Sequence, residues 1–277
     1  METKETVKIN EDISNRIVDF LNEQTGFDFS DYASPSLFRR FQRYVSLHNV
    51  TDLESFFQDL KENSLLLNQF IEEITVNVTE MFRDPLFYLS LRNEVLPELK
   101  KLEHIKIWHA GCSTGEEVYS MAIMLNEEGI LNKTLIYATD INQTVLARAK
   151  SGEYDAESIK LYAQNYKESE AKNDFYSNFQ MKEGIAFINP ELKKNIIFSS
   201  HNLVSEGVFN QFDLIVCRNV LIYFNKTLQN QVLETFYKSL ASNAFLALGS
   251  KETLLFSPIE TRMRTLNPKW KTWRKVE

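Results

Sequence analysis

Short apolar runs that alternate with helical segments after residue 104 constrain the fold of this chain more than any other feature. The runs that predict strands are IKIWHAG, LIYATD, NIIFSSHN, FDLIVCRN and FLALGS. This pattern is typical of a parallel sheet with helices on both faces, and we therefore predict an α/β fold. Ligands of such sheets bind beyond the carboxyl ends of the strands. Polar residues gather at those ends here, in HAGCSTGEE, ATD, SSHN and CRN.

Before residue 104 the apolar residues recur at helical spacing, in SPSLFRRFQRYVSL, TDLESFFQDL and SLLLNQFIEEI. Thr51 and Glu54 predict a capping box at the start of the second of these helices. Asp84 and Pro85 predict the N-cap and first turn of a further helix. We expect an N-terminal all-helical domain with its linker over residues 1–83, followed by the sheet domain over residues 84–277.

The second and third predicted strands are separated by a long interruption, at about residues 151–195. It contains FQMKEGIAFIN, two alternating segments around Glu183 and Gly184, which predicts a hairpin with a short turn. We therefore expect a small antiparallel β-subdomain inserted in the sheet domain. Near the end of the chain, NPKWKTWRK alternates apolar and charged residues and predicts a last, edge strand.

Charge and cysteine content narrow the class of protein. With 31 Lys and Arg against 38 Asp and Glu, the net charge of −7 disfavours a nucleic-acid-binding protein. The polar first residues do not resemble a signal peptide, and no stretch is apolar enough for membrane insertion. Cys112 and Cys217 form neither a C-x-x-C pair nor a metal-ligand cluster. We expect a cytoplasmic globular protein with no metal site.

The stretch AGCSTGEEVYS indicates the kind of cofactor. Gly111 and Gly115 follow a predicted strand, and Glu116 and Glu117 stand where the next helix should begin. This is not the G-x-G-x-x-G pattern of dinucleotide sites, and two acids would repel a pyrophosphate. They would attract a cationic ligand instead, and S-adenosylmethionine carries both an α-ammonium and a sulfonium. The alternative is that the two acids only complement the helix dipole.

Asp140 closes the second predicted strand, where an acid can accept hydrogen bonds from both ribose hydroxyls of a nucleoside. It could equally be the N-cap of the helix that begins near NQTVLARAK. Taken together with the loop at Gly111, Asp140 predicts that the chain binds an adenosyl group.

Five ordered motifs, TVNVTEMFRD, GCSTGEEVYS, ATDIN, SSHNL and FDLIVCRNVLIYF, resemble those of the CheR family of chemotaxis receptor methyltransferases. The resemblance runs from about residue 12 to the C-terminus. It implies a helical N-terminal domain, a Rossmann-like S-adenosylmethionine-dependent methyltransferase domain and an inserted β-subdomain. It also implies methylation of glutamate side chains on the cytoplasmic helices of chemoreceptors, with S-adenosylhomocysteine as the second product.

The resemblance also implies the site residues. Matching motif by motif, the cofactor contacts fall on Asn77, Thr79, Arg83, Glu117, Asp140, Asn202, Leu203, Arg218 and Asn219. We add Gly111 from the glycine loop. Tyr223 corresponds to a tyrosine beside the transferred methyl group. As catalytic residues we predict Arg83, which would steer the substrate glutamate or close the site, and Tyr223, which would fix the geometry.

The chemistry needs no acid/base pair. A glutamate carboxylate, with an ordinary pKa of about 4.3, is already ionised near neutral pH. The enzyme has to hold oxygen, methyl carbon and sulfur in line, which can supply a large share of the barrier reduction.

Receptor binding is predicted for a basic helix face. Arg39, Arg40 and Arg43 lie close together on a helix and could meet the acidic cytoplasmic methylation region of a receptor, the role of their counterparts in the family. The alternative is an ordinary solvated helix face. We expect a monomer. Some family members also bind the C-terminal pentapeptide of a receptor by strand addition to the β-subdomain. The turn at Gly184 is short, so the sequence does not decide whether this chain binds such a peptide.

One departure from the family pattern lies after the last motif strand, where Lys251 stands in place of the usual small polar residue. Ser250 and Lys251 could change the substrate pocket. Two other functions stay open from the sequence. One is methylation of small molecules or RNA, and the other is a non-catalytic receptor-binding or cofactor-sensing module.

Overall fold

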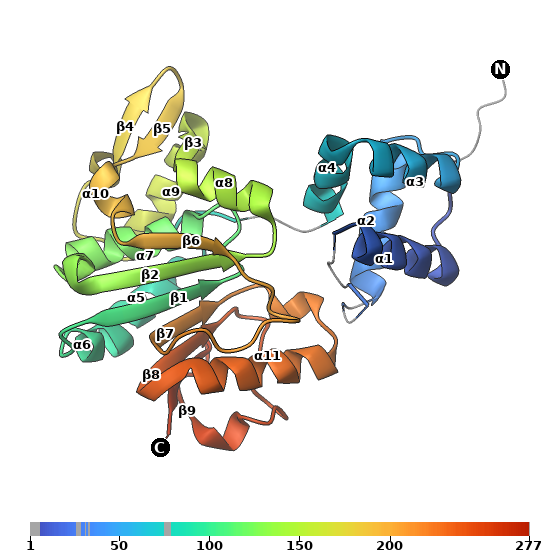
Figure 1. Ribbon diagram of the computed structural model, residues 1–277. Coiled ribbons are helices and arrows are strands. Elements are labelled where there is room, and N and C mark those ends of the chain that lie inside the picture. The colour runs from blue at the N-terminus through green and yellow to red at the C-terminus, as the bar shows by residue number, and fades with distance from the viewer. Residues whose placement is uncertain (1–5, 26–28, 31, 33, 75–78, 277) are drawn as a thin grey trace. The chain divides into compact units, whose positions relative to one another are not determined.

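The computed structural model describes residues 6–25, 29, 30, 32, 34–74 and 79–276 (Figure 1). The chain folds into two compact units. The helical unit consists of Met1–Asn77 and Ile222–Gln229, and the sheet unit consists of Val78–Leu221 and Asn230–Glu277. The domain boundary that the sequence predicts between residues 83 and 84 stays a prediction.

Four helices make up the described N-terminal part of the helical unit: α1 (Glu11–Thr25), α2 (Ser34–Leu47), α3 (Leu53–Glu62) and α4 (Ser64–Ile74). Their apolar faces meet in one core. The ring of Phe70 lies edge-on to those of Tyr44 and Phe56, at centroid distances of 4.6 and 5.3 Å. Such edge-to-face pairs favour one arrangement of the helices. The helices predicted before residue 75 are confirmed.

The N-cap of α3 differs from the prediction. The cap is Asp52, whose carboxylate accepts a hydrogen bond from the backbone N–H of Ser55 at 2.6 Å. Thr51 lies one residue too early because the helix begins at Leu53. An aspartate at this position caps as well as a serine or threonine, so the helix itself was predicted correctly.

The sheet unit is built on seven strands in the order β6-β2-β1-β7-β8-β10-β9 (Figure 1). Their bounds are β1 (Ile105–Ala110), β2 (Thr134–Asp140), β6 (Ile196–Ser200), β7 (Phe212–Cys217), β8 (Leu240–Leu248), β9 (Met263–Asn267) and β10 (Thr272–Lys275). The strands from β6 to β8 pair in parallel. Their carboxyl ends therefore share one side of the sheet, the carboxyl edge, and all five predicted strands are confirmed.

The last two strands correct one prediction. β10, from the segment predicted as the edge strand, lies between β8 and β9 and is antiparallel to both. The edge strand is β9. Alternation along a segment shows that it is a strand but not which neighbours it pairs with.

Helices cover both faces of the sheet. The helices outside the small subdomain are α5 (Pro85–Ser90), the π-helical turn η1 (Leu91–Val95), α6 (Leu96–Leu99), α7 (Glu116–Glu127), α8 (Gln143–Ser151) and α11 (Lys226–Ser239). Ile107 of β1 joins a core formed with α5, η1 and α7. The next residue, Trp108, points to the opposite face, where its ring lies 5.3 Å from that of Phe236 in α11. This two-sided covering confirms the predicted α/β class.

The predicted inserted subdomain is a three-stranded antiparallel sheet in the order β3-β5-β4. It comprises β3 (Glu153–Asp155), α9 (Ala156–Glu168), β4 (Phe179–Lys182), β5 (Ile185–Ile188) and α10 (Pro190–Lys193). Glu183 and Gly184 join β4 to β5 with φ of 50° and 80°, as a two-residue hairpin turn requires. Single 3₁₀ turns lie at η2 (Leu131–Lys133), η3 (Phe175–Asn178), η4 (Leu221–Tyr223) and η5 (Glu260–Arg262). No helix in the described part of the chain is long and apolar enough to span a membrane.

Candidate functional site at the carboxyl edge of the sheet

The glycine loop between β1 and α7 makes a tight turn that only glycine fits. Gly111 has φ of +75°, and a Cβ atom there would lie 2.5 Å from Cγ2 of Val220. Gly115 has φ of +91°, and a Cβ atom there would lie 3.0 Å from Cβ of Ala149. The N–H groups of Gly111 and Cys112 both donate to the carbonyl of Thr139. The loop is thereby fixed to the end of β2, and its backbone stays accessible to a ligand.

Asp140, the last residue of β2, lies against this loop. Its two carboxylate oxygens accept hydrogen bonds from the N–H groups of Ser113 at 2.9 Å and Asn142 at 3.0 Å. Burial raises the pKa of Asp140, while the backbone hydrogen bonds oppose the rise. The alternative role of N-cap is wrong, because Asn142 caps α8 by accepting hydrogen bonds from Thr144 and Val145.

The two acids at the start of α7 lie in different environments. Glu116 is buried and accepts a hydrogen bond from the hydroxyl of Thr114 at 2.7 Å. Burial raises the pKa of Glu116 to about 7. Burial alone would also raise the pKa of Glu117, but hydrogen bonds and charges from His109 and Arg218 lower it below the ordinary value. Glu117 is therefore the acid of the pair that keeps its negative charge near neutral pH.

Arg218, directly after β7, is the centre of a buried ion cluster. Its side chain is 2% exposed and binds the carboxylates of Glu117, at 3.0 Å, and of Asp84. The carboxylates raise the pKa of this arginine, although burial opposes them. Nδ1 of His109 donates to the second oxygen of Glu117 at 3.0 Å. The carbonyl of Arg83 also accepts from the guanidinium, at 3.4 Å. Four segments of the sheet unit thus meet at one point.

The ion cluster carries a surplus of negative charge. Two carboxylates, from Asp84 and Glu117, face one guanidinium. Among the described residues, no lysine binds either carboxylate. These three groups together carry one negative charge, which favours a ligand with a cationic end at this edge.

The segment that carries Thr79 and Arg83 is held in an uncommon backbone conformation. Phe82 and Asp84 have φ of 54° and 57°. The N–H of Phe82 donates to the hydroxyl of Ser120 in α7 at 2.8 Å. Asp84 stands at the N-cap position of α5 and Pro85 in its first turn, as predicted, but the side chain of Asp84 makes no capping hydrogen bond and binds Arg218 instead. Arg83 and Thr79 are half-buried.

The other predicted cofactor residues lie at neighbouring strand ends. Asn202 follows β6, and its side-chain oxygen accepts a hydrogen bond from Val204 at 2.9 Å; Leu203 beside it is half-buried. The N–H of His201 donates to the carbonyl of Asp140 at 3.2 Å, which ties β6 to the end of β2. Asn219 follows Arg218 with φ of 62°. Asn77 lies outside the described residues.

Glu252 is a positioning residue that the sequence reasoning missed. This buried carboxylate accepts four backbone N–H hydrogen bonds, three from residues 219–221 and one from Gly249. Burial raises the pKa of Glu252 and the backbone hydrogen bonds oppose the rise. It fixes the segment after β7 to the segment after β8. The available indication was an acid two residues after the predicted strand FLALGS, in the stretch GSKETL.

Tyr223 and the predicted receptor-binding arginines belong to the helical unit. Arg39 and Arg43 are exposed on α2. Arg40 is half-buried, donates to the carbonyl of Ile74 at 2.7 Å and lies 4.4 Å from the ring centre of Tyr223. The three arginines therefore do not present one uniform exposed face, because Arg40 has partners of its own.

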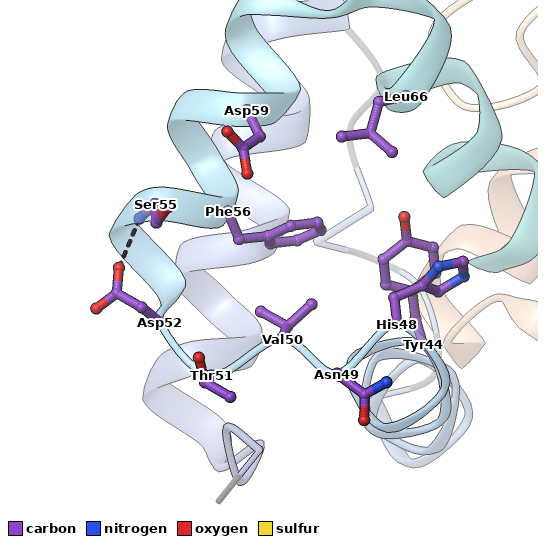
Figure 2. Close-up of a pocket in the computed structure, with 10 residues that line it drawn as sticks. All are labelled: Tyr44, His48, Asn49, Val50, Thr51, Asp52, Ser55, Phe56, Asp59 and Leu66. Carbon is purple, nitrogen blue, oxygen red and sulfur yellow. Dashed lines mark hydrogen bonds between the residues drawn. The ribbon is translucent and has the colours of Figure 1, made fainter. Parts of the chain in front are cut away.

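The helical unit also contains a pocket of 360 Å³ between α2, α3 and α4 (Figure 2). Figure 2 shows the ring of Phe56 pointing toward that of Tyr44, with Asp52 hydrogen-bonded to Ser55 at the rim. None of the predicted site residues is among the described residues that line it: Tyr44, His48, Asn49, Val50, Thr51, Asp52, Ser55, Phe56, Asp59 and Leu66. No cluster of potential metal ligands occurs in the part of the chain that the structure describes.

Both units match models of known protein domains. Residues 77–270 match the model described as CheR methyltransferase, SAM binding domain, and residues 14–75 match CheR methyltransferase, all-alpha domain. The protein Cher3 of Pseudomonas putida is 40% identical over 98% of this chain and 99% of its own length. The chemotaxis protein methyltransferases of Listeria monocytogenes and Salmonella typhimurium are 33% and 30% identical, over 87% and 86% of this chain and 90% and 82% of their own lengths.

Proposed function

Because the chain belongs to the CheR methyltransferase family, we propose that it transfers the methyl group of S-adenosylmethionine to glutamate side chains of chemoreceptors. The products are a γ-glutamyl methyl ester and S-adenosylhomocysteine. We further propose that it acts as a cytoplasmic monomer on the cytoplasmic methylation region of these receptors. The observation that carries the proposal is the surplus of negative charge at the carboxyl edge, within a sheet unit that matches the family's cofactor-binding domain.

The residues at the carboxyl edge fit S-adenosylmethionine. The two carboxylate oxygens of Asp140 accept hydrogen bonds from the backbone N–H groups of Ser113 and Asn142, and their remaining lone pairs would accept hydrogen bonds from ribose hydroxyls. The carboxylates of Glu117 and Asp84 would hold the α-ammonium, and Arg218 would orient the carboxylate of the amino-acid end. Gly111 and Gly115 leave the space that side chains would fill.

The acceptor chemistry also supports the proposal. The cofactor supplies a methyl group bound to a cationic sulfur, and an ionised glutamate carboxylate attacks it without a general base. The thiols at the site are not competing acceptors, because burial raises the pKa of Cys112 and of Cys217 well above the ordinary value. What this chain has to do is align the two partners and exclude water.

Arg83 and Tyr223 have distinct proposed roles. Arg83 lies in a segment that Phe82 and Asp84 fix, so its side chain starts from a well-defined backbone position. It would steer the substrate carboxylate, while Tyr223 would set the geometry near the methyl group. Arg83→Ala should lose methyl transfer far more than cofactor affinity. A proportional loss of both would identify Arg83 as a cofactor ligand only.

The receptor-binding role of α2 is proposed chiefly for its two exposed arginines. Charge reversal at Arg39 and Arg43 should lower the rate of receptor methylation while leaving cofactor affinity unchanged. Charge reversal at Arg40, which binds the carbonyl of Ile74 and lies over the ring of Tyr223, should instead lower the stability of the protein. Unchanged methylation by the Arg39 and Arg43 variants would remove this part of the proposal.

The decisive experiment joins binding and product analysis. Calorimetric titration with S-adenosylhomocysteine should show binding that Asp140→Ala loses. Asp213→Ala is the matched control, because that carboxylate also accepts a backbone N–H, from Lys106 at 2.8 Å, but at the amino end of β7. Labelled methyl groups should then appear on a receptor fragment as a base-labile ester. Binding without transfer would favour a non-catalytic module, and a base-stable product would indicate another acceptor.

A further inference from the structure

The loop that follows β8, residues 249–259, lies at the carboxyl edge beside the candidate site. β8 is parallel to β7, so this loop and the segment after β7 leave the sheet on the same side. At its first residue, Gly249, a Cβ atom would lie 2.8 Å from the backbone nitrogen of Asn219. The loop therefore begins in direct contact with the segment that carries Arg218 and Asn219.

The inner side of this loop is fixed. Glu252 is 5% exposed, and its carboxylate accepts the backbone N–H groups of Gly249 and of the segment after β7. Leu254 and Ile259 are buried, and the N–H of Ser257 donates to the carbonyl of Leu254 at 2.9 Å. A loop anchored at both ends and in the middle holds its outward-facing residues in defined positions.

Those outward-facing residues are large and apolar, with one cation. Phe256 is 81% exposed and Leu255 is 50% exposed, and Lys251 is exposed as well. Phe256 has φ of 59°, a left-handed conformation that is rare for an aromatic residue and costs about 1–2 kcal/mol. Its N–H donates to the carboxylate of Glu260 at 2.7 Å, which holds this conformation. Stability does not explain a strained backbone that holds a phenylalanine in water.

We propose that Lys251, Leu255 and Phe256 form a substrate-reading rim, which contacts the receptor segment on both sides of the target glutamate. This inference rests on the proposed function. The attacking carboxylate must reach the methyl group at the carboxyl edge, so the helix that carries it lies against side chains exposed at that edge. Phe256 and Leu255 pack on apolar side chains of that helix, one turn from the glutamate, and Lys251 pairs with its acidic groups.

The test separates substrate recognition from cofactor binding. We would measure kcat, KM for a receptor fragment that spans the methylation region, and the Kd of S-adenosylhomocysteine. Phe256→Ala and Lys251→Ala should raise KM for the fragment about tenfold, or about 1.4 kcal/mol each, as expected for contacts at the centre of an interface. The value of kcat at saturation and the Kd should stay within about twofold of wild type.

Matched controls come from the opposite, amino edge of the sheet. Leu102 precedes β1 and Lys238 precedes β8, and both are exposed. Leu102→Ala and Lys238→Ala should leave KM unchanged. Phe256→Asn adds a second check, since asparagine tolerates positive φ. This variant should be at least as stable to heat as wild type and still show the raised KM, which excludes unfolding as the cause.

Each other outcome overturns the proposal. An unchanged KM in the Phe256 and Lys251 variants, with an active wild type, overturns the rim alone. An equal loss of S-adenosylhomocysteine affinity would make the loop a wall of the cofactor site. Self-association that Phe256→Ala abolishes, with KM unchanged, would assign the apolar pair to a contact between copies of the chain. Absence of methyl ester with wild-type protein would overturn the proposed function itself, and the rim with it.

Discussion

The two ends of α7 each have a buried arginine that binds two carboxylates, but the charges around them differ. At the C-terminal end Arg92 binds Glu127 and Glu128, and Lys100 and Lys172 bind Glu128 as well, at 2.6 and 2.7 Å. At the N-terminal end the cluster of Arg218 has no such lysines among the described residues. The C-terminal end has three cations for two carboxylates, whereas the N-terminal end keeps a surplus of negative charge.

The helix dipole explains why the two ends can differ. Carboxylates are unfavourable near a helix C-terminus, so Glu127 and Glu128 need several cations to be buried there. Near the N-terminus the dipole itself stabilises Glu117, and fewer cations suffice. The C-terminal cluster therefore serves stability, and the N-terminal cluster leaves a place for a cationic ligand. Variants at the arginines, the glycines and the glutamates compare these two ends.

The largest effects should come from removing the arginines. Arg218→Met and Arg92→Met both leave buried carboxylates without their main partner, which costs about 3–5 kcal/mol. The loss should be at least as large for Arg92, because Lys100 and Lys172 bind only Glu128 and leave Glu127 without the cation that binds it, at the helix end where the dipole disfavours a carboxylate. Urea unfolding measures both losses, and calorimetry should find that only the Arg218 variant loses affinity for S-adenosylhomocysteine. An equal loss of affinity in a folded Arg92 variant would end the distinction between the two clusters.

Alanine substitutions at the glycines near the two ends of α7 should lower stability by smaller amounts than the arginine substitutions do. Gly111 and Gly129 have similar φ of 75° and 70°, but a Cβ atom at Gly129 would have no neighbour within 4 Å. Gly129→Ala should cost about 1 kcal/mol from the backbone conformation alone. Gly111→Ala also pushes against Val220, which adds about 1–3 kcal/mol and should weaken cofactor binding. Similar melting temperatures for the two variants would show that Val220 moves away without cost.

Asp140→Asn tests the charge beside the glycine loop with little change of structure. The amide oxygen can still accept a hydrogen bond from Ser113 or Asn142, so the stability loss should be about 1 kcal/mol. Loss of charge-assisted hydrogen bonds to a ribose should lower affinity for S-adenosylhomocysteine about tenfold to a hundredfold. Unchanged affinity in calorimetry would show that Asp140 serves only the fold of the loop.

The last comparison concerns pH, where each group changes the free energy of unfolding by at most about 1.4 kcal/mol per pH unit. Burial raises the pKa of Glu116 from 4.5 to about 7, so its contribution to stability is present below pH 4.5 and lost as pH rises to 7. For Glu128 burial acts in the same direction, but Lys100 and Lys172 outweigh it and lower the pKa to about 2. Its contribution is present above pH 4.5 and lost as pH falls to 2.

Replacement of Glu116 or Glu128 by glutamine should remove the contribution of that residue to the dependence of unfolding free energy on pH. Glu116→Gln should flatten the dependence of unfolding free energy on pH between 4.5 and 7, and Glu128→Gln should flatten it below 4.5. Urea unfolding at a series of pH values measures both. A Glu116 variant with the wild-type slope would mean that this carboxyl is ionised at neutral pH like Glu117.

The sequence predicted the sheet unit well because its indications are local. Each strand is a short apolar run, whereas the order of the strands in the sheet was not predicted. The place of β10 between β8 and β9 depended on pairing, which the alternation in NPKWKTWRK does not contain. The hairpin at Glu183 and Gly184 was predictable because two residues determine such a turn.

The sequence predicted where the residues of the candidate site lie, but not which other residues their side chains bind. Asp140, Glu117 and Arg218 all lie at the carboxyl edge, as expected from strand ends. The sequence placed Asp84 at a helix N-cap but did not reveal that its side chain binds Arg218, because the two residues are far apart along the chain. The family resemblance singled out Glu117, but the charge pattern alone did not distinguish it from Glu116, since the burial and charge partners that decide their ionisation arise only in the folded protein.

The strand order has a consequence for synthesis of the chain. β1 lies between β2 and β7 in the sheet, and Ile107 of β1 pairs with Leu214 of β7. Because β7 comes late in the chain, the small sheet, α8 and β6 are all synthesised before this pairing can form. We expect nascent chains that end before β7 to expose one edge of β1, next to the apolar side chains of Ile107 and Trp108. Such an edge invites pairing with other chains, and partly made protein should depend on chaperones until β7 has left the ribosome.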